Sequence, residues 1–128
     1  MPQLFGRNPN QKPTKRRPVK EKVIEQKFRD LCIAEGWLCI KMVQTGLVGI
    51  PDRLVIVPSG QYIWVELKSS VGKLSPIQVA AHQKLRHNKA IVLTGCEPFT
   101  LMAECAILAG YYSVWLKYGP QRVIKLKR

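Results

Sequence analysis

Apolar and polar residues repeat with two different periods along this chain, and the two periods predict where helices and strands lie. Between residues 21 and 35, Ile24, Phe28 and Leu31 mark an apolar stripe with spacings of three and four, which predicts a helix that Gly36 can end. Short runs rich in β-branched residues, separated by Gly and Pro, predict strands at 37–43, 52–57, 61–68 and 90–94.

Two further helices follow from capping and from apolar content. Ser75 is a good N-cap and Pro76 suits the first helical position, so a helix is predicted from there to about His87. Residues 98–109 are mostly apolar and predict a third helix, whereas the looser alternation over 111–126 favours a further strand. The order of helix, three strands, helix, strand and helix indicates one α/β or α+β domain whose sheet lies between helices.

The charge of the chain predicts the kind of partner that it binds. Its 128 residues carry 21 Lys and Arg against 8 Asp and Glu, a net charge of +13, while 46% of the residues are hydrophobic. That composition supports a folded core and predicts a polyanionic partner, most often nucleic acid and less often an anionic membrane surface. Because no run of about 18 apolar residues and no apolar signal segment occurs, we expect a cytoplasmic protein that neither spans a membrane nor is secreted.

Residues 1–20 differ from the rest of the chain. They hold six basic residues, several prolines and no acid, which predicts a flexible basic arm in front of a single domain at 21–128. Lys15, Arg16 and Arg17 form its densest run, and we expect them to contact a phosphate backbone. A solubilising tail or a nuclear-import-like run would carry the same charges, so both alternatives stay open.

The turn Pro58-Ser59-Gly60 fixes how the two strands around it pair. In a three-residue hairpin loop the last position is often left-handed and favours Gly. The register that follows sets Asp52 directly opposite Glu66 on one face, and the strand period places Lys68 on that same face. Asp52 and Glu66 are the only acids between residues 36 and 96.

The facing pair needs a compensating charge, because two carboxylates this close repel each other. One Mg²⁺ or Mn²⁺ could bridge Asp52 and Glu66, since hard divalent cations bind carboxylate oxygens. Such a metal polarises a phosphate while Lys68 orients or deprotonates the attacking water, so the set fits hydrolysis of a phosphodiester bond. The alternative is that both acids only form surface salt bridges with Arg53 or Lys68.

The motifs around these residues resemble those of a known family. Gly49-Ile50-Pro51-Asp52, followed by Val65-Glu66-Leu67-Lys68, resembles the P-D…(D/E)-x-K pattern of the PD-(D/E)XK superfamily of restriction-endonuclease-like nucleases. Gly72 and the segment Lys73-Leu74-Ser75-Pro76-Ile77-Gln78 extend the likeness to one branch, the virus-type replication-repair nuclease (VRR-NUC) family. The resemblance covers about residues 21–95. It implies an α/β fold with a restriction-endonuclease-like core, a mixed sheet of three to five strands flanked by helices.

The resemblance also implies roles for individual residues of the strands and the following loop. Asp52, Glu66 and the Leu67 carbonyl would bind Mg²⁺ or Mn²⁺, and Lys68 would act on the attacking water. Lys73, in the loop before the second helix, would contact DNA.

Two helical positions carry over less directly. The family has a glutamate on its first helix that faces the site, which Glu25 matches better than Glu21, and a helix glutamine that contacts the site or the DNA, which Gln78 matches. Ser75-x-x-Gln78 is also a capping box, in which the glutamine bonds back to the helix start. His82 lies one turn after Gln78 on the same helix face. We expect it to be solvated or partly buried, with a phosphate contact as the alternative.

The sequence as a whole resembles small stand-alone viral members of this family. We therefore expect a divalent-metal-dependent DNA endonuclease, located in the host cytoplasm if viral. One domain cuts one strand, so a homodimer with two matched cuts would suit Holliday-junction-like, four-way DNA. The apolar stretch 101–108, with Tyr111, Tyr112 and Trp115, is either dimer interface or core.

Other functions stay open. A nuclease acting on flaps, nicks or duplex DNA would carry the same motifs, and a non-catalytic basic nucleic-acid-binding module would explain the charge. A nucleotide cofactor is not expected, because Gly46 and Gly49 are not followed by the Lys-Ser/Thr of a phosphate-binding loop.

Overall fold

The computed structural model describes residues 16–43 and 46–126, with side chains placed at 21–43 and 46–119. Within these ranges no helix is long and apolar enough to cross a membrane. The helices are α1 (Arg16–Ala34), α2 (Pro76–His87), α3 (Pro98–Ala109) and α4 (Tyr112–Leu126). The strands are β1 (Leu38–Lys41), β2 (Arg53–Ile56), β3 (Tyr62–Leu67) and β4 (Ile91–Gly95).

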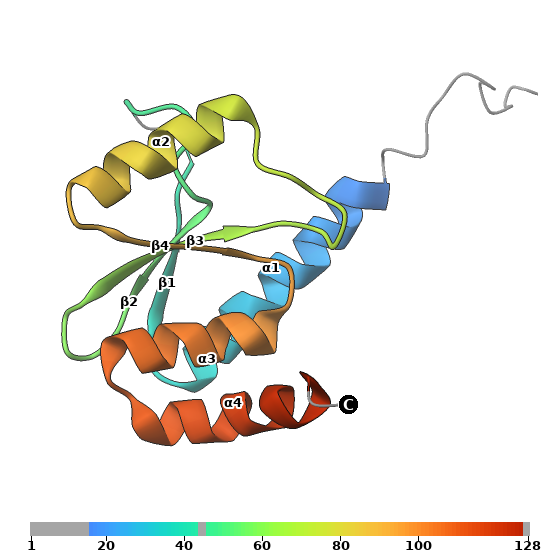
Figure 1. The fold of residues 1–128 in the computed structure, drawn as a ribbon, viewed down its shortest axis with the longest axis vertical. Coiled ribbons are helices and arrows are strands. Elements are labelled where there is room, and N and C mark those ends of the chain that lie inside the picture. Colours follow the sequence, from blue (N-terminus) through green and yellow to red (C-terminus); the bar gives the residue numbers. More distant parts are fainter. Residues whose placement is uncertain (1–15, 44–45, 127–128) are drawn as a thin grey trace, which may run out of the picture.

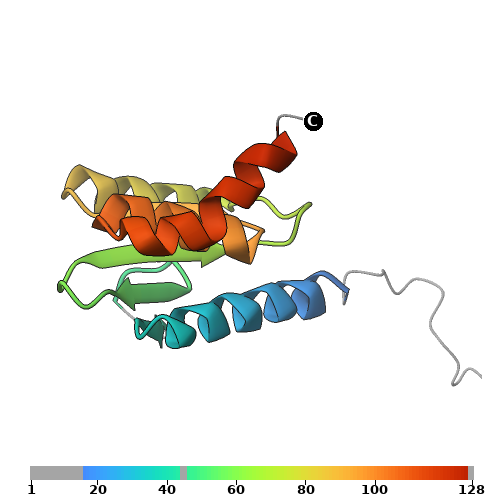
Figure 2. The ribbon, with the colours of Figure 1, turned by 90° about the horizontal axis from the view of Figure 1, so that it is seen from below.

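The strands form one mixed sheet in the order β1-β2-β3-β4. β1 pairs with β2 and β2 with β3 in antiparallel fashion, whereas β3 and β4 are parallel and are joined through α2. Figure 1 shows α2 on one side of the sheet and α1, α3 and α4 on the other. In Figure 2 the helices α1 and α3, which contact each other, lie side by side across that second side. The predicted α/β fold with a mixed sheet flanked by helices is confirmed.

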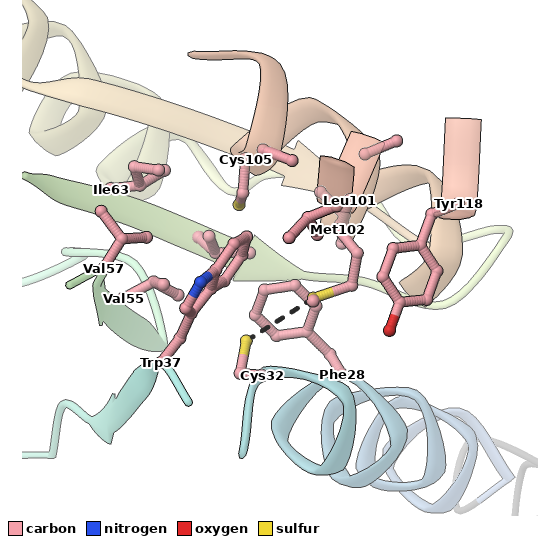
Figure 3. Packing of buried hydrophobic residues seen from close by; sticks show 14 of the residues in the cluster. Phe28, Cys32, Trp37, Val55, Val57, Ile63, Leu101, Met102, Cys105 and Tyr118 are labelled. Carbon is pink, nitrogen blue, oxygen red and sulfur yellow. Dashed lines mark hydrogen bonds between the residues drawn. The ribbon is translucent and has the colours of Figure 1, made fainter. Parts of the chain in front are cut away.

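The hydrophobic core lies between the sheet and the α1–α3 pair. Val55 and Ile63 point from the sheet toward Phe28 of α1 and Leu101 of α3, and all four side chains are at most 1% exposed (Figure 3). Because successive residues of a strand point to opposite faces, alternate residues of the same strands face away from this core. The motif residues Asp52 and Glu66 belong to that opposite face.

The main error of the sequence-based prediction lies at the C-terminus, where the expected strand is the helix α4. Its inward residues Val114 and Tyr118 are buried and four positions apart, which is the helical period. Gly110 ends α3 in the left-handed conformation, with φ of 80°, and the chain turns directly into α4. A short run of mixed apolar and polar residues fits the helical period and the strand period equally well. Only the surface that the segment packs against decides between them.

The first helix also begins earlier than the sequence indicates. Helix α1 starts at Arg16, so it includes residues 16–20, whose composition predicts part of the basic arm. Residues 1–15, including Lys15, lie outside the described residues.

Candidate active site

The β2–β3 hairpin brings the two predicted acids together. Its register is the predicted one, with Leu54 facing Trp64 and Arg53 facing Val65. Continuing this register by one residue sets Asp52 opposite Glu66. Gly60 closes the turn in the left-handed conformation, with φ of 91°, as expected for the last position of such a loop.

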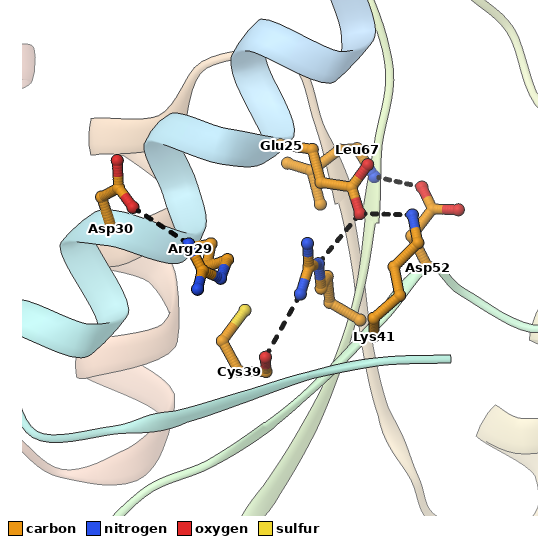
Figure 4. A network of polar contacts seen from close by, with 8 residues as sticks. Glu25, Arg29, Asp30, Cys39, Lys41, Asp52 and Leu67 are labelled. Carbon is orange, nitrogen blue, oxygen red and sulfur yellow. Dashed lines mark hydrogen bonds and ion pairs between the residues drawn. The ribbon is translucent and has the colours of Figure 1, made fainter. Parts of the chain in front are cut away.

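The Asp52 carboxylate reaches across to β3. Its Oδ2 accepts a hydrogen bond of 3.3 Å from the backbone N–H of Leu67 (Figure 4). This bond holds Asp52 beside Glu66, and the negative charge of Asp52 is one of the causes that raise the pKa of Glu66. The two carboxylates are therefore close enough for the charge of Asp52 to shift the pKa of Glu66.

Glu66 is a buried acid, with only 2% of the residue exposed. Burial, and then the Asp52 charge, raise the pKa of Glu66 to about 8, while the Lys68 ammonium group opposes this rise. The Lys68 Nζ atom lies 3.6 Å from Glu66 Oε2. Without further positive charge, Glu66 therefore holds a proton near neutral pH, and a cation beside it would release that proton.

Lys68 is fixed by its backbone directly after β3. Its N–H donates a 3.0 Å hydrogen bond to the Gly95 carbonyl at the end of β4, which continues the parallel pairing. Its side chain is 16% exposed, so the ammonium group lies beside the carboxylates with limited access to solvent.

Gln78 combines the two roles that the sequence left as alternatives. Its Oε1 accepts a 2.9 Å hydrogen bond from the Ser75 N–H, while the Gln78 N–H donates to Ser75 Oγ at 3.2 Å, which completes the capping box. Its Nε2 donates to Glu66 Oε2 at 3.1 Å. One amide group thus caps α2 and holds the buried carboxylate.

The glycine before Pro51-Asp52 allows a close approach between this loop and α2. A Cβ atom at Gly49 would lie 2.7 Å from both the carbonyl oxygen and Cγ2 of Ile77, and Gly49 has φ of +91°. Any other residue would push the loop away from the first turn of α2. The contact fixes the loop that leads to Asp52 against the turn that carries Gln78.

The two candidate helix carboxylates lie in different surroundings. Glu25 Oε2 accepts from Lys41 Nζ at 2.6 Å and from Arg53 Nε at 2.9 Å, in the same close-up as Asp52 (Figure 4). Glu21 approaches the loop after β3, since a Cβ at Gly72 would lie 3.3 Å from its Oε2. Arg53 is therefore paired with Glu25 and is not the salt-bridge partner that we considered for Asp52 or Glu66.

The predicted DNA-binding residues are only partly described. Lys73 is exposed in the loop between β3 and α2. Arg16 and Arg17 lie in the first turn of α1, and Lys15 lies outside the described residues.

His82 is the residue that the sequence-based prediction placed wrongly. It is completely buried rather than solvated or partly buried, and its Nε2 lies 4.0 Å from Glu66 Oε1. Burial and the charges of Arg86 and Lys68 lower the pKa of His82. Its spacing of four from Gln78 indicated the shared helix face, but not that this face turns toward the sheet.

The donors available for a metal ion are two carboxylates and nearby backbone oxygens. In the described part of the chain, no three His, Cys, Asp or Glu side chains gather as a metal-binding group. Asp52 and Glu66, with the Leu67 carbonyl, are the set that the sequence suggested.

Comparisons with known proteins place this arrangement in a family, although no protein-family model matches the chain. The chain is 36% identical over 69 residues to "Putative nuclease p44" of Acyrthosiphon pisum secondary endosymbiont phage 1, across 54% of this chain and 74% of that protein. A solved structure described as "VRR_NUC domain" superposes with a TM-score of 0.60 and 29% identity, over 69% of this chain and 94% of the other. With the ordered motif and the hairpin geometry, these likenesses show that the chain belongs to the VRR-NUC family of nucleases.

Proposed function

We propose that this nuclease is a divalent-metal-dependent endonuclease that hydrolyses phosphodiester bonds in DNA. The observation that carries the proposal is the facing pair of Asp52 and Glu66, one of them buried, with the Lys68 ammonium group beside them. Burying a carboxylate next to a second one is unfavourable unless a cation joins them. The pair therefore fits a bound cation better than a purely structural role.

The donor set fits Mg²⁺ or Mn²⁺. The Oε1 atom of Glu66 is buried and has no hydrogen-bond partner among the described residues, so its two lone pairs can accept one hydrogen bond and still bind a metal ion. Asp52 and Glu66 would hold the ion, with the Leu67 carbonyl as a third ligand. When bound, such an ion polarises the scissile phosphate and makes water a stronger nucleophile.

The remaining site residues act on water, on charge and on orientation. Lys68 orients the attacking water and stabilises the negative charge that develops on the phosphate. Gln78 keeps the Glu66 carboxylate in place. Glu25 supports the site from α1, where its ion pairs fix Lys41 and Arg53 next to the loop that ends in Asp52.

The substrate is held by the positive charge of the chain. Lys73 is exposed on the loop that connects Lys68 to α2, where it would contact the phosphate backbone beside the site. Lys15, Arg16 and Arg17 would bind phosphates farther along the DNA. A net charge of +13 favours such contacts and makes binding strongly dependent on salt.

We further propose that a homodimer cuts four-way, Holliday-junction-like DNA. Leu38 and Ile40 of β1 and Tyr62 of β3 are 60%, 40% and 61% exposed and lie on the sheet face that carries Asp52 and Glu66. An apolar face of this kind suits a second copy better than a phosphate backbone. A two-fold contact there would bring two catalytic pairs close together, as two matched cuts require.

The apolar stretch that we considered for this interface is mostly core. Leu101 and Cys105 are buried against the sheet, while Tyr112 on α4 is 63% exposed and stacks on Trp115. The sheet face is preferred because it is continuous with the site.

The proposal is tested by incubating the protein with end-labelled four-way junction and matched duplex, in Mg²⁺, Mn²⁺ or EDTA, with Asp52→Asn as the control. We expect paired, symmetric cuts in the junction with either metal and none with EDTA or the variant. Equal cutting of the matched duplex would show that the four-way junction is not the preferred substrate. DNA that is bound but never cut would favour a binding module.

A further inference from the structure

Helix α2 buries a polar ring where packing alone would favour an apolar side chain. His82 is 0% exposed, and both of its ring nitrogens are buried without a hydrogen-bond partner among the described residues. A buried polar group without a partner destabilises a protein by about 1–3 kcal/mol. Such a group at a functional site points to an interaction that the site requires.

A second buried atom without a partner faces the ring. Glu66 Oε1 has no hydrogen bond among the described residues, and the nearest ring nitrogen, His82 Nε2, is 4.0 Å away. The other oxygen, Oε2, is held by Gln78 at 3.1 Å and lies 3.6 Å from Lys68 Nζ. The carboxylate is therefore anchored at one oxygen and faces His82 with the other.

The helical spacing explains why both donors come from α2. Gln78 and His82 are four residues apart, so they lie one turn apart on the same face of the helix. The helix thus offers one donor to each oxygen of the same carboxylate. A separation of 4.0 Å is too long for a direct hydrogen bond. A shift of roughly 1 Å, or one bridging water, would complete the contact.

We propose that His82 is a positioning residue of the site, whose neutral imidazole donates its Nε2 proton to Oε1 of Glu66 and fixes the orientation of that carboxylate. The proposal rests on the proposed metal-dependent function, because the orientation matters for the ion that Glu66 would bind. Substitution of a residue that orients a metal-binding carboxylate typically lowers metal affinity or activity by about 10–100-fold.

The first test separates stability from metal binding. His82→Leu removes the donor at similar volume, so the melting temperature of the metal-free protein should stay level or rise, while Mn²⁺ affinity measured by calorimetry falls by about 10–100-fold. His82→Gln, which supplies an amide N–H donor in place of the ring N–H, should retain part of the Mn²⁺ affinity that His82→Leu loses. His87→Leu is the matched control, because His87 is exposed at the end of the same helix, and it should change neither quantity. Unchanged Mn²⁺ affinity in His82→Leu would overturn the proposal.

The second test needs neither metal nor DNA. The chain has 2 histidines, so ¹⁵N spectra of the imidazole rings in metal-free protein contain His82 and His87, and His87→Leu assigns them. Above pH 8, where Glu66 is ionised, we expect His82 to carry its proton on Nε2, and a proton on Nδ1 would refute the hydrogen bond. A wild-type protein that bound no Mn²⁺ and cut no DNA would refute the proposed function. The tautomer of His82 would still show whether the hydrogen bond to Glu66 forms.

Discussion

The two faces of the sheet come from the same strands, yet they are completed in opposite ways. Toward α1 and α3, side chains such as Val55, Ile63 and Leu101 form a closed apolar core. Toward α2, the helix packs against β4 and presents Gln78 and His82 to the buried Glu66. One face thus holds the apolar core, and the other buries polar groups of the candidate site, Glu66 and His82.

The helices α2 and α3 show the same contrast at the level of sequence. Each has 12 residues, a proline near its start and an N-cap side chain that accepts hydrogen bonds from the first turn. Five residues of α3 are buried and all are apolar, whereas the buried residues of α2 are Ala81 and His82. Similar rules of helix formation thus produce a packing helix in one case and a site-supporting helix in the other.

The largest expected effect comes from breaking the α2 face at its carboxylate pair. In Asp52→Asn, metal-dependent cleavage should fall by at least about 10²–10³-fold, because the variant loses a carboxylate ligand of the metal ion that would stabilise the transition state. The melting temperature without metal should stay level near neutral pH, where Glu66 is protonated, and should rise above pH 8, where the variant relieves repulsion with the ionised Glu66. Single-turnover cleavage and thermal unfolding measure the two effects, and DNA binding should persist. Cleavage at the wild-type rate would remove Asp52 from the site.

Breaking the core face should instead reduce stability. Leu101 is 1% exposed and packs against the sheet, so Leu101→Ala should lower the free energy of unfolding by about 2–5 kcal/mol. Urea denaturation measures this loss. If Leu101→Ala were as stable as the wild type, while His82→Leu unfolded readily, the assignment of the two faces would be reversed.

The pH dependence of stability should expose the strain on the α2 face. The pKa of Glu66 is raised to about 8, so between its ordinary range and pH 8 the folded protein holds a proton that the unfolded chain releases. The stability of the metal-free protein should therefore fall as the pH rises from about 5 to 8, by at most a few kcal/mol.

Melting temperatures across that pH range, in chelator, measure this fall, and Glu66→Gln should flatten the curve. A wild-type curve as flat as that of Glu66→Gln would mean that Glu66 is charged throughout.

The smallest expected effect tests the exposed part of the same face. Leu38→Glu should weaken self-association by about tenfold or more, because it places a charge in the proposed interface. Tyr112→Glu is the matched control, since Tyr112 is equally exposed, at 63%, on the other side of the sheet. Sedimentation of both variants measures the oligomeric state. Dissociation by Tyr112→Glu alone would move the interface to α4.

Local rules were sufficient to predict the hairpin and its acid pair. The turn at 58–60 contains its own register, and the alternation of strands then determines which residues share a face. The capping box at Ser75 and Gln78 could be predicted equally well, because it depends on two residues that are three positions apart. All of these interactions are close in sequence.

The features that were missed depend on contacts between distant segments. Helix α4 is recognisable only when Val114 and Tyr118 have a surface to bury against. The pairing of Glu25 with Lys41 and Arg53 requires α1 to lie across the ends of β1 and β2. The burial of His82 likewise depends on which way α2 turns, and no residue near it in sequence decides that.

The two hydrogen bonds made by the side-chain amide of Gln78 have a consequence for local unfolding. The same amide closes the first turn of α2 and holds Glu66, so any fraying of that helix end must release the carboxylate as well. The hydrogen bonds of the first turn of α2 and the contact from Gln78 to Glu66 should therefore break in one cooperative step. The lifetime of this helix cap should thus limit how long Gln78 holds Glu66 between openings.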